Sequence, residues 1–404
     1  MGIGYSKGDK DTEIQHLNDT VNNLKNQLQE KSTCVTLLEN ELNALRNMGN
    51  DKTLNPDILK EMNRTFIDQD YEYLVLSGGG IKGISYTGAL LELDNRGILY
   101  DRDNKFKLKG IAAASAGAIM ASLIAIGYKP QELNRITLDI DFEKIFDDKL
   151  GYFRDTINFF RDWGVCPGDY IQELLGELIK QKTGNANYTL EDLYRDKGVK
   201  LVIVTTDMCT EKTIYLYAGN PVKEFSNIPI KTCVRASMGI PFAYAPYKYN
   251  GCFLVDGGLL DNYPLHVFDG DYPGDPKARL NLCCANPKVL GLKIMTTDDK
   301  LDYDIINKQN FDGLFSYAFS YIDAFLSEND RRIMTPSFWL RSIIIVTPDY
   351  SLTKFNLTDK EKADLIEIGK RYVDNFFTKP ISKALLMKPM FSTFGECSSL
   401  SHFD

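Results

Sequence analysis

Residues 73–83 read YLVLSGGGIKG, an apolar run that ends in a cluster of glycines. A short run without polar alternation is typical of a strand buried on both faces of a parallel sheet. Apolar residues at helical spacing follow (Ala89, Leu90 and Leu93), so the stretch predicts a strand, a glycine-rich loop and then a helix. The backbone N–H groups of such a loop, together with the positive end of the helix dipole, can hold an anion.

The glycine loop has two interpretations when it is taken alone. It matches G-x-G-x-x-G, the dinucleotide-binding pattern, and Asp94 follows near the place where an acidic ribose ligand is expected. It is not a Walker phosphate loop, because Gly83 is followed by Ile84 and Ser85 rather than by Lys and then Ser or Thr. A nucleotide-binding regulator is therefore one alternative for this protein.

A second strand and helix are predicted at 106–114 and 116–126, with Ser115 at their junction. A nucleophile elbow holds its serine on a tight, strained turn and needs small residues two positions away on either side. Those positions hold Ala113 and Gly117, where the usual pattern has two glycines. Ser115 is therefore a candidate nucleophile, although a core serine at the start of an alanine-rich helix would also fit.

The region around Ser115 is also free of charge over the 18 residues from Gly110 to Gly127. This length is close to the minimum for a transmembrane helix. The segment is rich in alanine and lies within the strand-and-helix pattern, so we expect it to be buried in the protein core.

Asp256 begins an Asp-Gly-Gly sequence directly after a strand predicted at 252–255. An Asp in a glycine turn usually bonds its own backbone. A serine nucleophile, however, needs a base within hydrogen-bonding reach. Asp256 is therefore a candidate for that base as well as a simple turn former.

Histidine is the usual partner of a catalytic serine, and the chain has only 3. His16 lies at an exposed heptad position and His402 is two residues from the C-terminus. His266 follows Asp256 by ten residues, so a Ser-Asp-His triad through His266 stays open. The shortage of histidines favours a two-residue mechanism with Ser115 and Asp256.

The rest of the chain alternates between predicted strands and helices. Further strands are expected at 200–206, 213–218, 289–295 and 343–347. This alternation predicts an α/β sandwich with a mostly parallel sheet. The stretch 130–182 is expected to be a mainly helical cap, whose aromatic residues either form core or cover an acyl-chain site. They are Phe153, Phe159, Phe160 and Trp163.

The N-terminal part carries two signals of its own. Gly2 and Ser6 fit the N-myristoylation pattern within a flexible segment at 1–10. Residues 11–48 carry a heptad repeat that predicts a coiled coil and self-association, the alternative being one long helix folded back on the globular body. Its a positions are Ile14, Val21, Leu28, Val35 and Leu42, and its d positions are Leu17, Leu24, Lys31, Leu38 and Leu45. We divide the remainder into a linker at 49–70, a catalytic domain at 71–300 and a C-terminal extension at 301–404 that packs on it.

Composition excludes several classes of protein. The net charge of -8 argues against general nucleic-acid binding, because such a surface repels polyanions. The 8 cysteines form no CxxC pair or Cys/His cluster, so we expect neither a metal site nor a cofactor. No secretory signal is visible, and we expect a cytoplasmic protein that binds membranes peripherally if Gly2 is acylated.

Taken in order, these motifs resemble those of the patatin-like phospholipases. They are the loop GGGIKG, the serine elbow, the block RASMGIP at 235–241, and DGG followed by Asn262 and Pro264. The resemblance covers about residues 72–268 and implies a three-layer α/β/α sandwich with a Ser-Asp dyad that cleaves acyl esters of lipids. By this resemblance Ser115 is the nucleophile and Asp256 the base. The oxyanion hole is carried over to Gly78, Gly79, Gly80, Ile81, Lys82 and Gly83.

The resemblance therefore predicts a phospholipase A-type acyl hydrolase without a metal, acting on phospholipid or another acyl-ester lipid at a membrane surface. Two alternatives from other classes remain. One is the nucleotide-binding regulator, and the other is an inactive scaffold that oligomerises through its coiled coil.

Overall fold

A computed structural model of the protein describes residues 70–145, 164–273, 275, 285–296, 321–322, 338, 341–348, 350 and 356–378. The predicted coiled coil, the myristoylation candidate Gly2 and the four aromatic residues of the expected cap lie outside these residues. Within the described part, no helix is long and apolar enough to cross a membrane.

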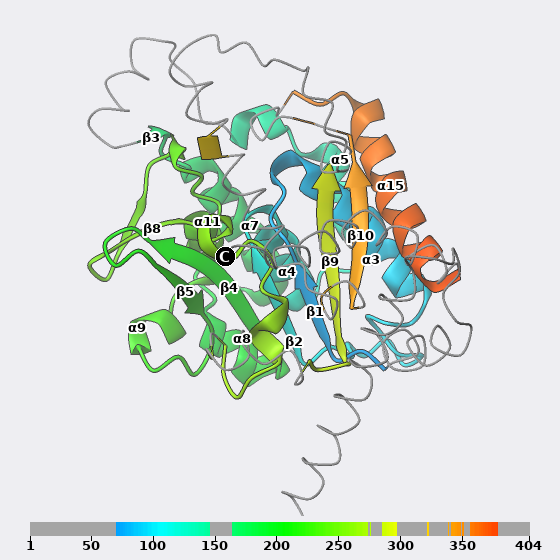
Figure 1. Ribbon diagram of the computed structural model, residues 1–404, viewed down its shortest axis with the longest axis horizontal. Coiled ribbons are helices and arrows are strands. Elements are labelled where there is room, and N and C mark those ends of the chain that lie inside the picture. Colours follow the sequence, from blue (N-terminus) through cyan, green and yellow to red (C-terminus); the bar gives the residue numbers. More distant parts are fainter. Residues whose placement is uncertain are drawn as a thin grey trace, which may run out of the picture.

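The centre of the molecule is an eight-stranded mixed sheet in the order β10-β9-β1-β2-β4-β8-β7, with β5 paired to β4 (Figure 1). Five strands pair in parallel: β1 (Tyr73–Leu76), β2 (Gly110–Ala114), β4 (Lys200–Asp207), β9 (Val289–Thr296) and β10 (Ser342–Thr347). Every pairing of the other three is antiparallel: β5 (Lys212–Leu216), β7 (Tyr247–Tyr249) and β8 (Cys252–Asp256). The expectation of a mostly parallel sheet therefore holds only on the β1 side, because short turns join β4 to β5 and β7 to β8 and force antiparallel pairing.

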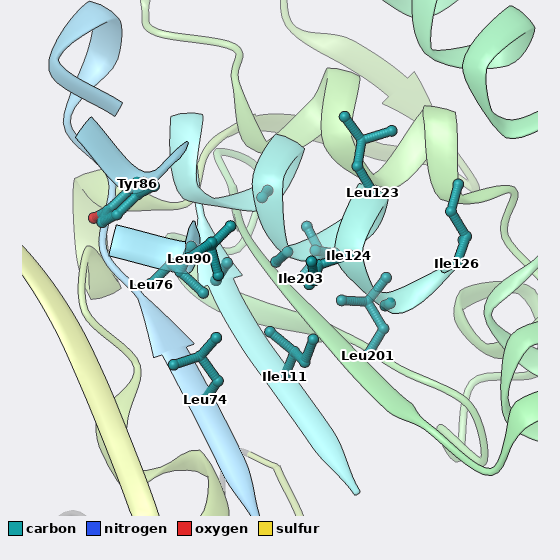
Figure 2. Packing of buried hydrophobic residues seen from close by; sticks show 14 of the residues in the cluster. Leu74, Leu76, Tyr86, Leu90, Ile111, Leu123, Ile124, Ile126, Leu201 and Ile203 are labelled. Carbon is teal, nitrogen blue, oxygen red and sulfur yellow. The ribbon is translucent and has the colours of Figure 1, made fainter. Parts of the chain in front are cut away.

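Successive residues of the central strands face opposite sides of the sheet, and both sides are buried. On β1, Leu74 and Leu76 join the larger hydrophobic cluster, whereas Val75 joins the cluster on the other face. This period of two explains why the strand sequence shows no polar alternation. Figure 2 shows the first face, where Ile111 of β2 and Ile203 of β4 also point toward the helices.

The helices that cover this first face include α3 (Ser85–Asn95), α4 (Ala116–Ala125), α8 (Leu190–Lys197), α10 (Ile230–Ser237) and α15 (Asp359–Thr378). α15 lies beside α3 at one side of the sheet (Figure 1). Gly88 of α3 and Gly369 of α15 let the two backbones come into contact. A Cβ at Gly369 would lie 1.9 Å from the carbonyl oxygen of Ser85. The chain between residues 342 and 378 thus adds both an edge strand and a helix to the same body.

The second face has a different cover among the described residues. Tyr263, Leu265 and Val267 pack there with Phe338, and η3 (Leu265–Phe268) is the helical element of this group. A complete second helical layer, as the three-layer prediction requires, is not seen within the described ranges.

The remaining elements of the described part are η1 (Gly80–Ile84), α5 (Pro130–Asp139), η2 (Phe142–Ile145), β3 (Gly164–Cys166), α7 (Asp169–Thr183), α9 (Lys223–Ser226), β6 (Phe242–Tyr244) and α11 (Gly258–Asp261). Local sequence sets several of these boundaries. Pro130 opens α5, Gly184 ends α7 in the left-handed region, and Thr189 and Asp192 form a capping box on α8.

Most predicted elements are confirmed within one or two residues, including the buried segment around Ser115. One boundary is wrong: the strand predicted from Phe106 begins at Gly110, because residues 101–109 form turns and a single bridge between Tyr100 and Phe106. The short strands β3, β6 and β7 had no prediction.

Candidate active site

The sheet brings Ser115 and Asp256 together through one edge of β4. β5 occupies the opposite edge of β4, so β2 and β8 share this edge and approach each other from opposite directions. Ala114, the last residue of β2, pairs with Val204, and Asp256, the last residue of β8, pairs with the next residue, Thr205. The two strands therefore end head to head, and the residues that follow meet.

Ser115 occupies a strained turn between β2 and α4. Its φ is 51° and its ψ is -130°, a conformation that residues with a side chain rarely adopt. The Ser115 backbone N–H donates to the hydroxyl of Ser237 at 2.9 Å. A Cβ at Gly117 would lie 2.6 Å from the carbonyl oxygen of Ser77, so α4 can approach β1 this closely only with glycine there. Ala113, by contrast, is fully buried in the core, and its methyl group is accommodated.

The hydroxyl of Ser115 donates a 2.7 Å hydrogen bond to Oδ2 of Asp256. The other carboxylate oxygen, Oδ1, accepts from the backbone N–H of Gly258 at 2.7 Å. Both side chains are buried. Burial raises the pKa of Asp256 to about 6, while the hydrogen bonds from Ser115 and Gly258 act in the opposite direction. This carboxylate is therefore a stronger base than an exposed Asp.

The glycine loop lies against the serine. A Cβ at Gly78 would lie 2.9 Å from Cβ of Ser115 and 2.2 Å from Oδ1 of Asn262, so only glycine fits. The Gly78 N–H already donates to the backbone carbonyl of Asn262 at 3.0 Å. Gly79 and Gly80 follow Gly78, and Gly80 takes a positive φ of 53° as it opens η1. The remaining loop residues, Ile81, Lys82 and Gly83, lie in η1 and are buried.

An apolar pocket of about 880 Å³, including its open side, begins at Ser115 and at the glycine loop. The described residues that line it come mainly from α4, α5 and α7, together with Met238, Ile240 and Tyr244. Its apolar wall suits a hydrocarbon chain rather than a charged ligand.

Two other sequence candidates lie elsewhere. The Nε2 atom of buried His266 lies 3.2 Å from the hydroxyl of Tyr215 and 3.6 Å from Oδ2 of Asp261, and it completes no triad with Ser115. Asp94 lies near the C-terminal end of α3, where it accepts a hydrogen bond from Gln131 at 3.0 Å. The glycine loop is at the other end of that helix, so Asp94 does not serve as a ribose ligand beside it.

Two further residues contribute to this site without a role predicted from the sequence. Ser237 supports the Ser115 turn, and Asn262 links the glycine loop to the Asp256 turn, since a Cβ at Gly258 would lie 2.6 Å from its Oδ1. Both belong to the motifs quoted above, where neither had a role of its own. Only their positions within those motifs could have indicated a role in the site, because a serine or an asparagine by itself indicates none. The described residues hold no group of three or more side chains suited to a metal ion.

The part of the chain that holds this site is similar to known proteins. Residues 74–269 match the family model described as "Patatin-like phospholipase". The uncharacterized protein YqhO of Bacillus subtilis is 26% identical over 316 residues, 75% of this chain and 96% of YqhO. The probable lipid hydrolase 463L of Invertebrate iridescent virus 6 is 30% identical over 203 residues, 49% of this chain and 63% of the viral protein.

Among solved structures, VipD from Legionella pneumophila aligns with a TM-score of 0.48 and 19% identity, covering 76% of this chain and 67% of VipD. Residues 74–269 therefore form a patatin-like phospholipase domain within this chain.

Proposed function

We propose that this protein is a lipid acyl hydrolase of the phospholipase A type, which cleaves fatty-acyl esters through an acyl-enzyme. The observation that carries the proposal is the 2.7 Å hydrogen bond from Ser115 to Asp256 at one end of an apolar pocket. The family of residues 74–269 and the relative named as a probable lipid hydrolase support the substrate class.

In the proposed first half-reaction, Asp256 takes the hydroxyl proton of Ser115 while Oγ attacks the ester carbonyl carbon. The tetrahedral intermediate then collapses. The C–O bond to the leaving alcohol breaks, the alcohol departs with the proton from Asp256, and the acyl group stays on Ser115. In the second half, Asp256 deprotonates water, which attacks the acyl carbon. The C–O bond to Ser115 then breaks, the fatty acid is released, and Oγ of Ser115 takes back the proton from Asp256.

The proposed oxyanion hole lies in the glycine loop. Because the Gly78 N–H is bonded to Asn262, we assign the donors to Gly79 and Gly80, and Gly78 anchors the loop. Backbone donors held in a buried site stabilise developing negative charge without having to reorient. Loss of one such donor typically lowers the rate about 10²- to 10³-fold, so the loop matters nearly as much as the dyad.

Proposals about location and assembly rest on residues outside the described ranges. We propose that acylation of Gly2 gives weak membrane attachment and that the heptads at 11–48 form a homo-oligomer, so that several chains bind one surface together. Light scattering on the full-length protein with Leu24→Lys and Leu38→Lys tests the assembly. We expect the variant to be a monomer, and an unchanged oligomer would contradict assembly through the coiled coil.

Fatty-acid release from phospholipid vesicles tests the activity. We expect release by the wild type with or without a calcium chelator, and none by Ser115→Ala or Asp256→Asn. Ser122→Ala is the matched control, because Ser122 is a buried serine of α4 that does not line the pocket, and it should keep full activity. If folded wild type releases no fatty acid but binds a nucleotide, the regulator alternative replaces the hydrolase.

A further inference from the structure

The pocket beside Ser115 is walled by three helices that each present one stripe of side chains. Each stripe repeats the spacing i, i+3, i+4, i+7, which places residues on one face of a helix. The stripes are Ala116, Ile119, Met120 and Leu123 on α4; Leu133, Ile136 and Thr137 on α5, continued by Ile140 at its C-cap; and Ile171, Leu174, Leu175 and Leu178 on α7. The pocket therefore extends along the helices and has a near end at Ser115.

Leu123 and Leu178 lie together at the other end. α4 begins directly after Ser115, so Leu123 is the pocket residue of that helix that lies farthest from the nucleophile. Tyr128 links Leu123 to α7 by two hydrogen bonds. The Tyr128 backbone N–H donates to the Leu123 carbonyl at 3.0 Å, and the Tyr128 hydroxyl donates to the Leu178 carbonyl at 2.9 Å. Figure 2 shows Leu123 pointing away from the strands, whereas Ile124 points toward them.

The start of α5 closes the same end. Lys182, in the last turn of α7, pairs with Glu132 in the first turn of α5 at 2.7 Å. The Lys182 ammonium also lies 4.6 Å from the centroid of the Tyr128 ring. Leu133 follows Glu132 and is 1% exposed, so each of the three helices places a leucine at this end of the pocket.

We propose that Leu123, Leu133 and Leu178 act as a length gauge for the acyl chain; the proposal rests on the hydrolase function above. From Ala116 to Leu123 the α4 axis rises about 10 Å, at ~1.5 Å per residue. An extended hydrocarbon advances about 1.25 Å per carbon, because C–C bonds of ~1.5 Å zigzag at the tetrahedral angle. A chain of about eight carbons therefore fills the pocket, and longer chains meet the three leucines.

Hydrolysis of p-nitrophenyl esters of increasing chain length tests the gauge. For the wild type, kcat/KM should peak near the octanoyl ester and fall for the dodecanoyl and palmitoyl esters. Leu178→Ala should raise the dodecanoyl to octanoyl ratio at least about tenfold, because even one methylene group in an apolar pocket typically changes kcat/KM by about 10-fold or more. Leu178→Phe should move the optimum to shorter esters. Opposite shifts from two substitutions at one site cannot come from a general loss of stability.

Leu93→Ala is the matched control, because Leu93 is a buried leucine of α3 that does not line the pocket. It should leave the ratio between esters unchanged. Calorimetric binding of octanoate and dodecanoate to Ser115→Ala, and to Ser115→Ala combined with Leu178→Ala, measures the pocket without catalysis. Octanoate should bind more tightly than dodecanoate to the first protein, and the difference should shrink in the second.

The two readouts separate the proposals. Ester hydrolysis with a length profile that both Leu178 variants leave unchanged would overturn the gauge and keep the hydrolase. Length-dependent fatty-acid binding without any ester hydrolysis would keep the gauge and overturn the hydrolase.

Discussion

Ser115 and Asp256 are 141 positions apart in the chain, yet the hydroxyl of the first donates to the carboxylate of the second at 2.7 Å. Ala114, which precedes Ser115, pairs with Val204, and Asp256 itself pairs with the next residue of that strand, Thr205. Two strands that end head to head on a shared edge thus place the pair without a contribution from a flexible loop. Such a pair is held by the sheet itself, which suits a reaction that depends on distance.

The pH dependence of turnover is the first prediction. The proposed base must be ionised, and burial raises the pKa of Asp256 to about 6. We therefore expect kcat/KM to be level above pH 7 and to fall about tenfold per pH unit well below pH 6. Initial rates on a soluble octanoyl ester between pH 4 and 8 measure this. A profile that is level down to pH 4.5 would show that an ordinary Asp, or another group, is the base.

The same carboxyl group should lower stability at neutral pH. The pKa of Asp256 is about 6 in the folded protein, whereas the ordinary value for an exposed Asp is 3.8. At a pH between 3.8 and about 6, the folded state therefore holds a proton that the unfolded state releases. The free energy of unfolding therefore falls as the pH rises through this window. Asp256→Asn removes the charge and should stabilise the protein by about 1–3 kcal/mol at pH 8 but not at pH 4. Urea unfolding at both pH values checks it, and equal effects at the two would contradict it.

The strained turn of Ser115 gives a stability prediction that is independent of charge. With a φ of 51°, glycine fits this position better than any residue with a Cβ. We expect Ser115→Gly to be more stable than Ser115→Ala by about 1 kcal/mol, with neither variant active. Thermal unfolding of the two variants compares them directly. A Ser115→Ala protein that is equal or more stable would mean that the turn is not strained.

The small residues that flank the elbow should respond differently to substitution. Gly117→Ala places a Cβ 2.6 Å from the Ser77 carbonyl oxygen, so α4 must move from β1 and carry Ser115 with it. We expect a loss of about 2 kcal/mol or more in stability, in the range of overpacked cores, and a fall in kcat. Ala113→Gly removes one buried methyl group and should cost only about 1 kcal/mol while the dyad stays in place. Activity and unfolding of both variants test the contrast.

Much of this fold follows from local sequence. The parallel strands were predictable because Leu74–Leu76 and their equivalents are buried on both faces and carry no polar alternation. The hairpin of β7 and β8 was also predictable, because Asn-Gly is a typical sequence of a two-residue hairpin turn. In the structure Asn250 and Gly251 take the φ values of 48° and 78° that such a turn requires, and Tyr249 pairs with Cys252 across it.

The site was predictable only in part. The elbow and the Asp-Gly-Gly turn each indicate a local conformation, but neither says that they meet. Their contact depends on β8 running antiparallel on the edge of β4 that β2 also uses, which no local pattern encodes. The pocket was hidden for a similar reason, since the apolar stripes of α4, α5 and α7 look like ordinary core residues until the three helices come together.

Covalent labelling tests the central claim most directly. The full-length protein is treated with an alkyl fluorophosphonate, which reacts with activated serines and displaces fluoride, and the modified peptide is located by mass spectrometry. We expect one adduct, on Ser115, formed about 10²-fold or more slowly in Asp256→Asn because the hydroxyl has lost its base. An adduct on another serine, or equal labelling of Ser115 in both proteins, would contradict the Ser115–Asp256 dyad.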